Sequence, residues 1–261
     1  MVKGKLFYDK ADINRNKAYI KWLMEEGANQ GLNIELAVLG QDMLEPCDFV
    51  INRSRNYELA LKYELNGIPV YNNSKFTLVG NNKLAAYRFV QELGIPYGKI
   101  YLDELLENLP PKLIRKPNKG HGGQEVSLIQ TRENGWKINQ DSYLYQEYLE
   151  NIIGDVRYYI INNKIIHSII RTPQKGQVVS NFSRGGNISI YHPSKKEVDG
   201  VETILANIHI DFGGIDFLVG SDGSYRFNEF EDVVGSRMLS ALGINDTTYR
   251  YIKHIKNTVI Y

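Results

Sequence analysis

The first eighty residues alternate between short apolar runs rich in strand-forming residues and longer stretches with apolar residues at helical spacing. The predicted strands are 5–8, 34–39, 49–52 and 69–71, and the predicted helices are 16–27 and 57–65. Strands that alternate with helices over such short distances are typical of a small α/β unit with a parallel sheet. We therefore expect residues 1–79 to form an N-terminal α/β domain. Its polar loop 52–56 is either a ligand-binding strand end or an exposed basic turn.

A glycine-dense loop stands between two strand patterns in the second part of the chain. A helix is predicted over 83–93, where Gly94 ends it, and strands are predicted over 113–116 and 126–129. The loop 117–123 contains three glycines, whose small size lets a backbone approach a phosphate closely. A flexible connection between two strands would have the same composition. Neither a Walker loop nor the glycine pattern of dinucleotide-binding folds occurs in the sequence.

The third part of the chain predicts mostly antiparallel strands. The stretch 143–149 leads to Gly154-Asp155, and a hairpin of 157–161 and 165–171 follows, which turns across Asn162-Asn163. A polar glycine loop at 180–186 and a helix over 197–208 follow.

The last predicted hairpin contains three acidic residues among apolar and aromatic ones. Its turn signal is Asp-Gly at 222–223, and a two-residue loop there places Asp216 directly opposite Glu229. Glu231 shares the face of Glu229, because side chains two apart on a strand point the same way. The same alternation places three more side chains on this face: Leu218, Tyr225 and Phe227.

Three carboxylates on one face of a hairpin require an explanation. Two carboxylates about 5 Å apart repel by roughly 3 kcal/mol at an effective dielectric of 20. A bound divalent cation would offset this repulsion, and oxygen ligands favour Mg²⁺ or Mn²⁺. Alternatively, the acids lie on a solvent-exposed face, which the apolar neighbours argue against.

Composition narrows the class of protein. Charge is balanced, with 31 basic and 30 acidic residues, so we expect neither nucleic acid nor a membrane surface as a partner. The single cysteine, Cys47, excludes an intramolecular disulfide and a cysteine-based zinc site. We find no signal-peptide pattern and no bilayer-spanning apolar run, and expect a cytoplasmic protein.

The order of motifs after residue 72 resembles the ATP-grasp superfamily, in its RimK-like branch of carboxylate–amine ligases. The motifs that carry this resemblance are Asn82-Lys83, Leu93-Gly94-Ile95-Pro96, Ile114-Arg115-Lys116-Pro117, Gln146-Glu147-Tyr148-Leu149, Gly154-Asp155-Val156-Arg157, Arg171, Ser180-Asn181, Arg184-Gly185-Gly186, Gly214-Ile215-Asp216 and Asn228-Glu229-Phe230-Glu231. The resemblance implies an ATP-grasp fold of the α+β and α/β classes. The N-terminal α/β domain over 1–79 would precede a central lid subdomain over 80–145 and a C-terminal antiparallel-sheet subdomain over 146–261. ATP would bind between the last two.

The resemblance also implies roles for individual residues. The ATP-binding set would comprise two phosphate-binding lysines, a glycine lid, an adenine-binding segment and a ribose-binding acid: Lys83, Lys116, Gly120, Gly122, Gly123, Glu147, Tyr148, Leu149 and Asp155. The metal ligands would be Asp216, Glu229 and Glu231, for Mg²⁺ or alternatively Mn²⁺. The groups that hold the substrate carboxylate and its phosphorylated form would be Arg171, Asn181 and Arg184. For Asp155 the competing role is pairing with Arg157, and for Arg171 it is a structural salt bridge.

Two positions depart from the family pattern. Glu231 stands where relatives usually have asparagine, and Val179 stands where they often have arginine. The implied activity is an ATP- and Mg²⁺-dependent ligase that joins a carboxylate to an amine through an acyl phosphate, releasing ADP and phosphate. The alternatives are phosphotransfer to a non-carboxylate acceptor and a nucleotide-binding module without catalysis. The substrates would be small molecules or peptides, and relatives are commonly dimers or tetramers, so we expect a homo-oligomer.

Overall fold

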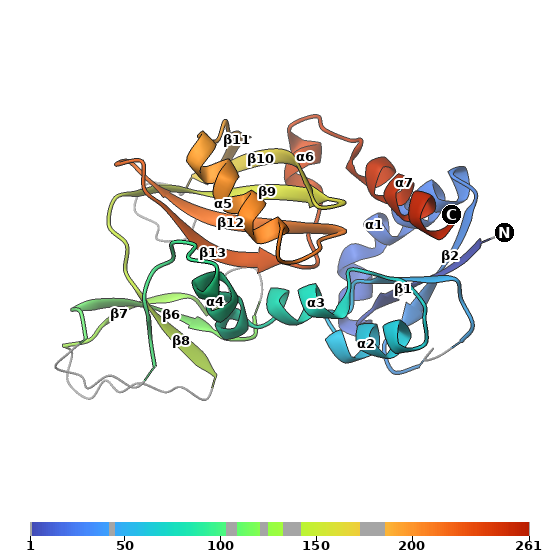
Figure 1. Ribbon diagram of the computed structural model, residues 1–261, viewed down its shortest axis with the longest axis horizontal. Coiled ribbons are helices and arrows are strands. Elements are labelled where there is room, and N and C mark those ends of the chain that lie inside the picture. The colour runs from blue at the N-terminus through green and yellow to red at the C-terminus, as the bar shows by residue number, and fades with distance from the viewer. Residues whose placement is uncertain are drawn as a thin grey trace.

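The computed structural model contains three β-sheets arranged along an elongated molecule (Figure 1). It describes residues 2–41, 45–102, 109–120, 125–132, 142–172 and 186–260. Among these residues, no helix combines the length and apolar character that crossing a bilayer requires.

The first sheet is wholly parallel, as the alternating pattern predicts. Its strands are β1 (Val2–Tyr8), β2 (Leu32–Val38), β3 (Phe49–Asn52) and β4 (Val70–Tyr71), in the order β2-β1-β3-β4. Two helices connect them, α1 (Lys10–Asn29) and α2 (Tyr57–Leu65), and α2 has the predicted bounds. α1 begins before the predicted residue 16, because the Asp9 side chain caps it by accepting a hydrogen bond from the Ala11 amide.

The loop that follows β3 is buried at its start. Asn52, Arg53 and Ser54 are 1%, 3% and 7% exposed. Arg53 donates hydrogen bonds to the Tyr8 hydroxyl at 2.7 Å and to the Val234 carbonyl at 2.9 Å. An exposed basic turn is therefore the wrong interpretation of this loop, since Arg53 joins the first sheet to the segment after the last hairpin. Ligand binding by the loop stays a prediction.

A small antiparallel sheet occupies the end of the molecule opposite the first sheet (Figure 1). Two helices lead to it, α3 (Ser74–Gly80) and α4 (Lys83–Glu92). The strands are β5 (Ile100–Tyr101), β6 (Lys112–Pro117), β7 (Ser127–Gln130) and β8 (Tyr143–Glu147), in the order β5-β8-β6-β7. β6 and β7 are the two strand patterns predicted on either side of the glycine loop, and they pair antiparallel.

The third sheet is antiparallel and contains the rest of the strands. They are β9 (Ile152–Ile161), β10 (Lys164–Thr172), β11 (Asn187–Ile190), β12 (Phe212–Gly220) and β13 (Tyr225–Glu231), in the order β11-β10-β9-β12-β13. The predicted turn between β9 and β10 is confirmed, because Asn162 and Asn163 have φ values of 48° and 58°. α5 (Lys195–Leu205) covers one face of the sheet (Figure 1), and its Val201 and Ile204 are completely buried there.

The C-terminal helices return the chain to the first sheet. They are α6 (Arg237–Ala241) and α7 (Thr247–Val259), neither of which was predicted. α7 lies beside α1 (Figure 1), and one hydrophobic core contains Leu6 of β1, Phe212 of β12 and Ile252 of α7. The first and third sheets are therefore held by shared packing. The predicted division into domains at residues 79 and 145 stays a prediction.

The hairpin of β12 and β13 has the predicted pairing of Asp216 with Glu229, but its loop is longer than predicted. The Gly223 amide donates to the Gly220 carbonyl at 3.1 Å, and Gly223 alone of the Asp-Gly pair has a positive φ, 75°. This loop shifts the register by one residue, so that Phe217 pairs with Phe227. A β-bulge at Asn228 then restores the predicted pairing at Asp216.

The bulge also corrects the predicted composition of the acidic face. Phe227 pairs with Phe217 and packs in the same core as Phe230, with ring centroids of the two β13 aromatics 4.8 Å apart. Tyr225 pairs with Val219 and lies in this core too. Placing Tyr225 and Phe227 on the face of the acids was therefore wrong, because the extra residue separates aromatic side chains from acidic ones.

Candidate functional site

The end of α3, the start of α4, the loop after β6 and the end of β13 converge on a polar cleft. Gly80, Lys83, Gly120, Glu229 and Glu231 are among the residues that line it. The Lys83 ammonium lies 3.8 Å from a Glu229 carboxylate oxygen and donates to the Gly120 carbonyl at 2.8 Å. Burial lowers the pKa of Lys83, and Glu229 offsets part of that effect.

The second predicted phosphate-binding lysine is buried beside this cleft. Lys116 is 5% exposed, and its ammonium donates to the Tyr87 hydroxyl at 2.5 Å and to the Asn228 side-chain oxygen at 3.3 Å. Burial lowers its pKa to about 8, although the Glu229 and Asp155 carboxylates favour the charged form. Asn228 is the bulge residue of β13, so the same irregularity that sorts the aromatics also directs an amide toward Lys116.

An ion-pair network extends from the cleft across four neighbouring strands. Asp216 is completely buried, and Arg157 contacts both of its oxygens, at 2.8 Å and 2.7 Å. The same guanidinium donates to Glu231 at 3.0 Å. Arg171 donates at 2.5 Å both to Asp216 and to Asp155.

The sheet register explains why these charges meet. Asp216 of β12 is directly opposite Glu229 of β13 and Arg157 of β9, and Asp155 of β9 is directly opposite Arg171 of β10. Burial opposes ionisation of Asp216, but the two guanidiniums outweigh it and hold its pKa below the usual value. Two arginines thus pair with three carboxylates, those of Asp155, Asp216 and Glu231, along one face of the sheet.

The structure corrects one pairing and adds residues to the site. Asp155 pairs with Arg171 and not with Arg157, whose guanidinium bridges Asp216 and Glu231. Sequence reasoning missed this role of Arg157, as well as Tyr87 and Asn228. The signal for Arg157 was its position two residues after Asp155, which places both on the same face of a strand that neighbours β12.

The donor set suits a divalent cation, although both oxygens of Asp216 already contact a guanidinium. All three predicted ligands offer oxygen atoms, and three carboxylates face two guanidiniums while Glu229 faces Lys83. One oxygen of Asp155 is buried without a hydrogen-bond partner in the described part of the chain. The side chains of Glu229 and Glu231 are 29% and 21% exposed, and so are accessible to an ion. Asp216, in contrast, contacts a guanidinium with each of its oxygens.

The predicted adenine-binding segment connects two sheets. Glu147 ends β8, and its amide donates to the Lys99 carbonyl at 2.8 Å. Tyr148 and Leu149 follow before β9, and all three residues are half-buried. The segment therefore links β8 of the small sheet to β9 of the third sheet, while nucleotide binding by it stays a prediction. The remaining predicted site residues, Gly122, Gly123, Asn181 and Arg184, lie outside the described residues, as does Val179.

Comparisons with known proteins find similarity over most of the chain. The family model of the RimK-like ATP-grasp domain matches residues 95–255. An uncharacterised protein of Mycoplasma pneumoniae is 24% identical over 253 residues, which cover 92% of this chain and 87% of that protein. N-acetylaspartylglutamate synthase A of Homo sapiens is 29% identical over 136 residues, which cover 49% of this chain and 34% of the synthase.

A solved structure shows the same fold. It is that of the ATP-grasp ligase PsnB complexed with a phosphomimetic variant of minimal precursor, Mg and ADP. The TM-score is 0.72 at 15% identity, and the match covers 98% of each chain. This likeness confirms the fold class predicted from the sequence.

Proposed function

The chain belongs to the RimK-like ATP-grasp family, and from this premise we propose that it is an ATP-dependent ligase that joins a carboxylate to an amine. The observation that carries the proposal is a row of charged side chains: Lys83 contacts Glu229, Asp216 lies directly opposite Glu229 in the sheet, and Arg171 contacts Asp216. This row would supply cationic groups for phosphates, carboxylates for a metal ion and an arginine for an anionic substrate.

The two lysines would bind the phosphates of ATP. Lys83 stands in the first turn of α4 and Lys116 near the end of β6, so they approach the cleft from different elements. An ammonium is a compact charge that can contact oxygens from several directions, which suits a triphosphate. Their burial strengthens the attraction, because it removes competing water.

Glu229 and Glu231 would hold Mg²⁺, with Asp216 behind them. When bound, Mg²⁺ would neutralise the charge of the β- and γ-phosphates. Arg157 holds Asp216 and Glu231 in place by contacting both, and thereby keeps two of the three carboxylates together. The glutamate at position 231 offers a full negative charge where relatives usually have an amide. The extra negative charge should favour a bound cation beside Glu231 over the contact with Arg157 alone.

Arg171 would position the substrate carboxylate. Its Nη2 is occupied by Asp155 and Asp216, but its buried Nε has no partner among the described residues. A substrate oxygen could accept that hydrogen bond. The substrate carboxylate would then attack the γ-phosphorus, so that an O–P bond forms while the bond to the ADP oxygen breaks. An amine would attack the carbonyl carbon of the resulting acyl phosphate, and inorganic phosphate would leave with the carbonyl–oxygen bonding pair as an amide forms.

The protein's contribution to this reaction would be positioning and charge neutralisation. None of the steps requires a side-chain nucleophile. Lys83 and Lys116 would offset negative charge on the transferring group, and the free Nε of Arg171 would donate to the substrate oxygens.

The test combines the protein with ATP, Mg²⁺, hydroxylamine and a panel of amino acids, N-acetylated amino acids and short peptides. Formation of a hydroxamate together with ADP is expected, because hydroxylamine traps an acyl phosphate. N-acetylaspartate and glutamate belong in the panel because of the synthase that the chain resembles, and peptides belong there because of the PsnB precursor. ADP formation with transfer of phosphate to a hydroxyl group, and no hydroxamate, would contradict the ligase.

The variant that tests the proposed metal site is Glu229→Gln. It removes one carboxylate charge from a side chain that is 29% exposed, and the protein should stay folded. We expect turnover to fall by about 10²-fold or more, the scale of losing one electrostatic group at a reacting phosphate. Lys253→Gln is the control, because Lys253 lies on α7 and does not line the cleft, and it should leave turnover unchanged. Wild-type turnover in Glu229→Gln would remove Glu229 from the proposed metal site.

A further inference from the structure

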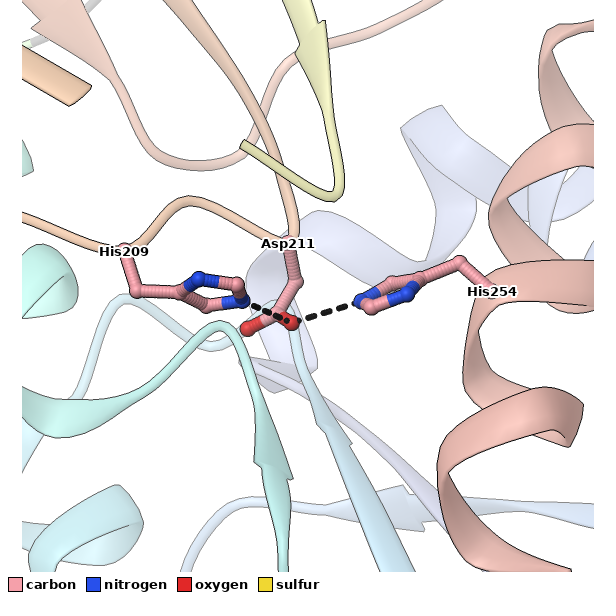
Figure 2. A group of neighbouring side chains, drawn as sticks. All are labelled: His209, Asp211 and His254. Atoms are coloured by element: carbon pink, nitrogen blue, oxygen red, sulfur yellow. Dashed lines mark hydrogen bonds and ion pairs between the residues drawn. The ribbon is translucent and has the colours of Figure 1, made fainter. Parts of the chain in front are cut away.

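A second cluster of metal-ligating side chains lies outside the proposed active site. His209 and Asp211 precede β12, and His254 lies on α7 (Figure 2). The two imidazole rings stand on opposite sides of the Asp211 carboxylate, and the Nε2 of each points at the same oxygen. The His209 Nε2 is 3.0 Å from Asp211 Oδ1, and the His254 Nε2 is 2.8 Å from it.

We propose that His209, Asp211 and His254 form a binding site for a transition-metal ion, with Zn²⁺ as the best-matching ion. One ligand atom from each residue lies within 4.8 Å of the other two. Zn–N bonds of about 2.0–2.1 Å place tetrahedral ligands about 3.3 Å apart, so small rotations of the side chains would suffice. Two imidazoles and one carboxylate suit Zn²⁺, Co²⁺ or Ni²⁺ better than Mg²⁺, which prefers oxygen ligands.

The burial of the three side chains fits a three-ligand site with one open position. The side chains of Asp211 and His254 are each 5% exposed, whereas that of His209 is 48% exposed. An ion could therefore reach the cluster from the His209 side, and water could complete its coordination there. A buried carboxylate needs a hydrogen-bond or charge partner, and without a metal ion the two imidazole Nε2 groups supply it.

The backbone around the ligands is fixed on both sides. The Asn73 side chain donates to the His209 carbonyl at 2.9 Å, and the Ile210 amide donates to the Asn163 side chain at 3.0 Å. The Asn162 amide donates to the Asp211 carbonyl at 3.0 Å. These bonds hold the segment that carries two of the ligands, so the site is largely preorganised.

The third ligand is held by the packing of α7. The His254 ring makes an edge contact with Tyr71 of β4, with centroids 5.7 Å apart. Tyr251, one turn earlier on α7, packs on Phe212 at a centroid distance of 4.9 Å. A bound ion would therefore connect α7 to the start of β12 beside the edge of the first sheet. The site is separate from the acidic cleft, since Asp211 and Asp216 are five residues apart, about 16 Å along an extended strand.

The experiment is a titration of chelator-treated full-length protein with Zn²⁺, in the presence of saturating Mg²⁺ to occupy the acidic cleft. One ion per chain and a rise in melting temperature are expected, because a ligand that binds only the folded state stabilises it. Co²⁺ should bind in competition with Zn²⁺ and give the absorption of a four- or five-coordinate ion.

Variants of the histidines decide the assignment. His209→Gln changes a half-exposed side chain, so the variant should fold normally. It should weaken Zn²⁺ binding at least about tenfold, because loss of a residue that only hydrogen-bonds a metal ligand already weakens binding by about that much. His254→Gln should do the same. His192→Gln, at an exposed histidine outside the cluster, should bind like the wild type. Equal affinity in the wild type and His209→Gln, or no stoichiometric binding to the wild type, would overturn the proposal. A protein without ligase activity would leave this result unaffected.

Discussion

At the scale of single residues, Lys116 links burial to a measurable pH dependence. Its pKa is lowered to about 8 by burial, so the free protein loses the ammonium charge as the pH rises through 8. Nucleotide phosphates favour the ammonium, and their own last ionisation is complete below this pH. ATP affinity should therefore be highest below pH 8 and should fall above it, by up to about tenfold per pH unit. Calorimetric titration with ATP at saturating Mg²⁺ measures this fall.

Substitution by arginine assigns the effect to one lysine. Lys116→Arg should remove the fall between about pH 8 and pH 10, because a guanidinium keeps its proton in this range. Lys83→Arg, the matched variant at the other cationic side chain of the cleft, should retain it. A pH profile that is unchanged by Lys116→Arg would show that Lys116 does not titrate against the nucleotide.

The carboxylates of the site could be predicted from the sequence, but one arginine that joins them could not. The three carboxylates were predicted from their alternation, and the pairing of Asp216 with Glu229 is confirmed. The bridge from Arg157 to Asp216 and Glu231 was not predicted. It depends on β9 lying beside β12, which local periodicity does not specify. Arg157 and Asp216 are 59 positions apart, and such a pair can be predicted only once the sheet order is known.

At the scale of elements, the hairpin of β12 and β13 owes its shape to two deviations that compensate each other. The loop shifts the register by one residue, and the bulge at Asn228 shifts it back. The predicted two-residue loop gives the correct acidic pairing because the two shifts cancel at Asp216 and Glu229. Neither shift was predicted, because neither has a local signature in the sequence. What selects the bulge is the burial of both Phe227 and Phe230 in one core, three residues apart, while Glu229 and Glu231 face the cleft.

The loop of this hairpin provides a test at the same scale. Gly223 has a φ of 75°, a conformation that an L side chain disfavours, while nothing would obstruct an added Cβ. Gly223→Ala should therefore lower the free energy of unfolding by about 1 kcal/mol through backbone strain alone. Gly235→Ala is the control, because Gly235 has open space and no positive φ. Urea denaturation of the two variants compares them, and equal stabilities would contradict the assigned turn.

At the scale of the whole molecule, the order of parallel and antiparallel units followed from the sequence, whereas their connection did not. Alternating strands and helices predicted the parallel first sheet, and the antiparallel hairpins predicted the third. The return of α7 to the first sheet was missed. Tyr251, Ile252 and Ile255 have the spacing of a buried helix face, but such spacing cannot identify which sheet covers it.

The shared core of α7 predicts that the first and third sheets unfold together. Ile252 is completely buried in the core that contains Leu6 of β1 and Phe212 of β12. Ile252→Ala should lower the free energy of unfolding by about 2–5 kcal/mol, since it leaves a cavity between the two units. Hydrogen exchange during denaturant titration should show β1 and β12 losing protection in one transition, at a lower denaturant concentration than in the wild type. Ile260→Ala, at a residue that is 45% exposed just after the same helix, should shift the transition little. Loss of protection in β1 while β12 stays protected would mean that the two sheets unfold independently, despite the core that α7 shares with both.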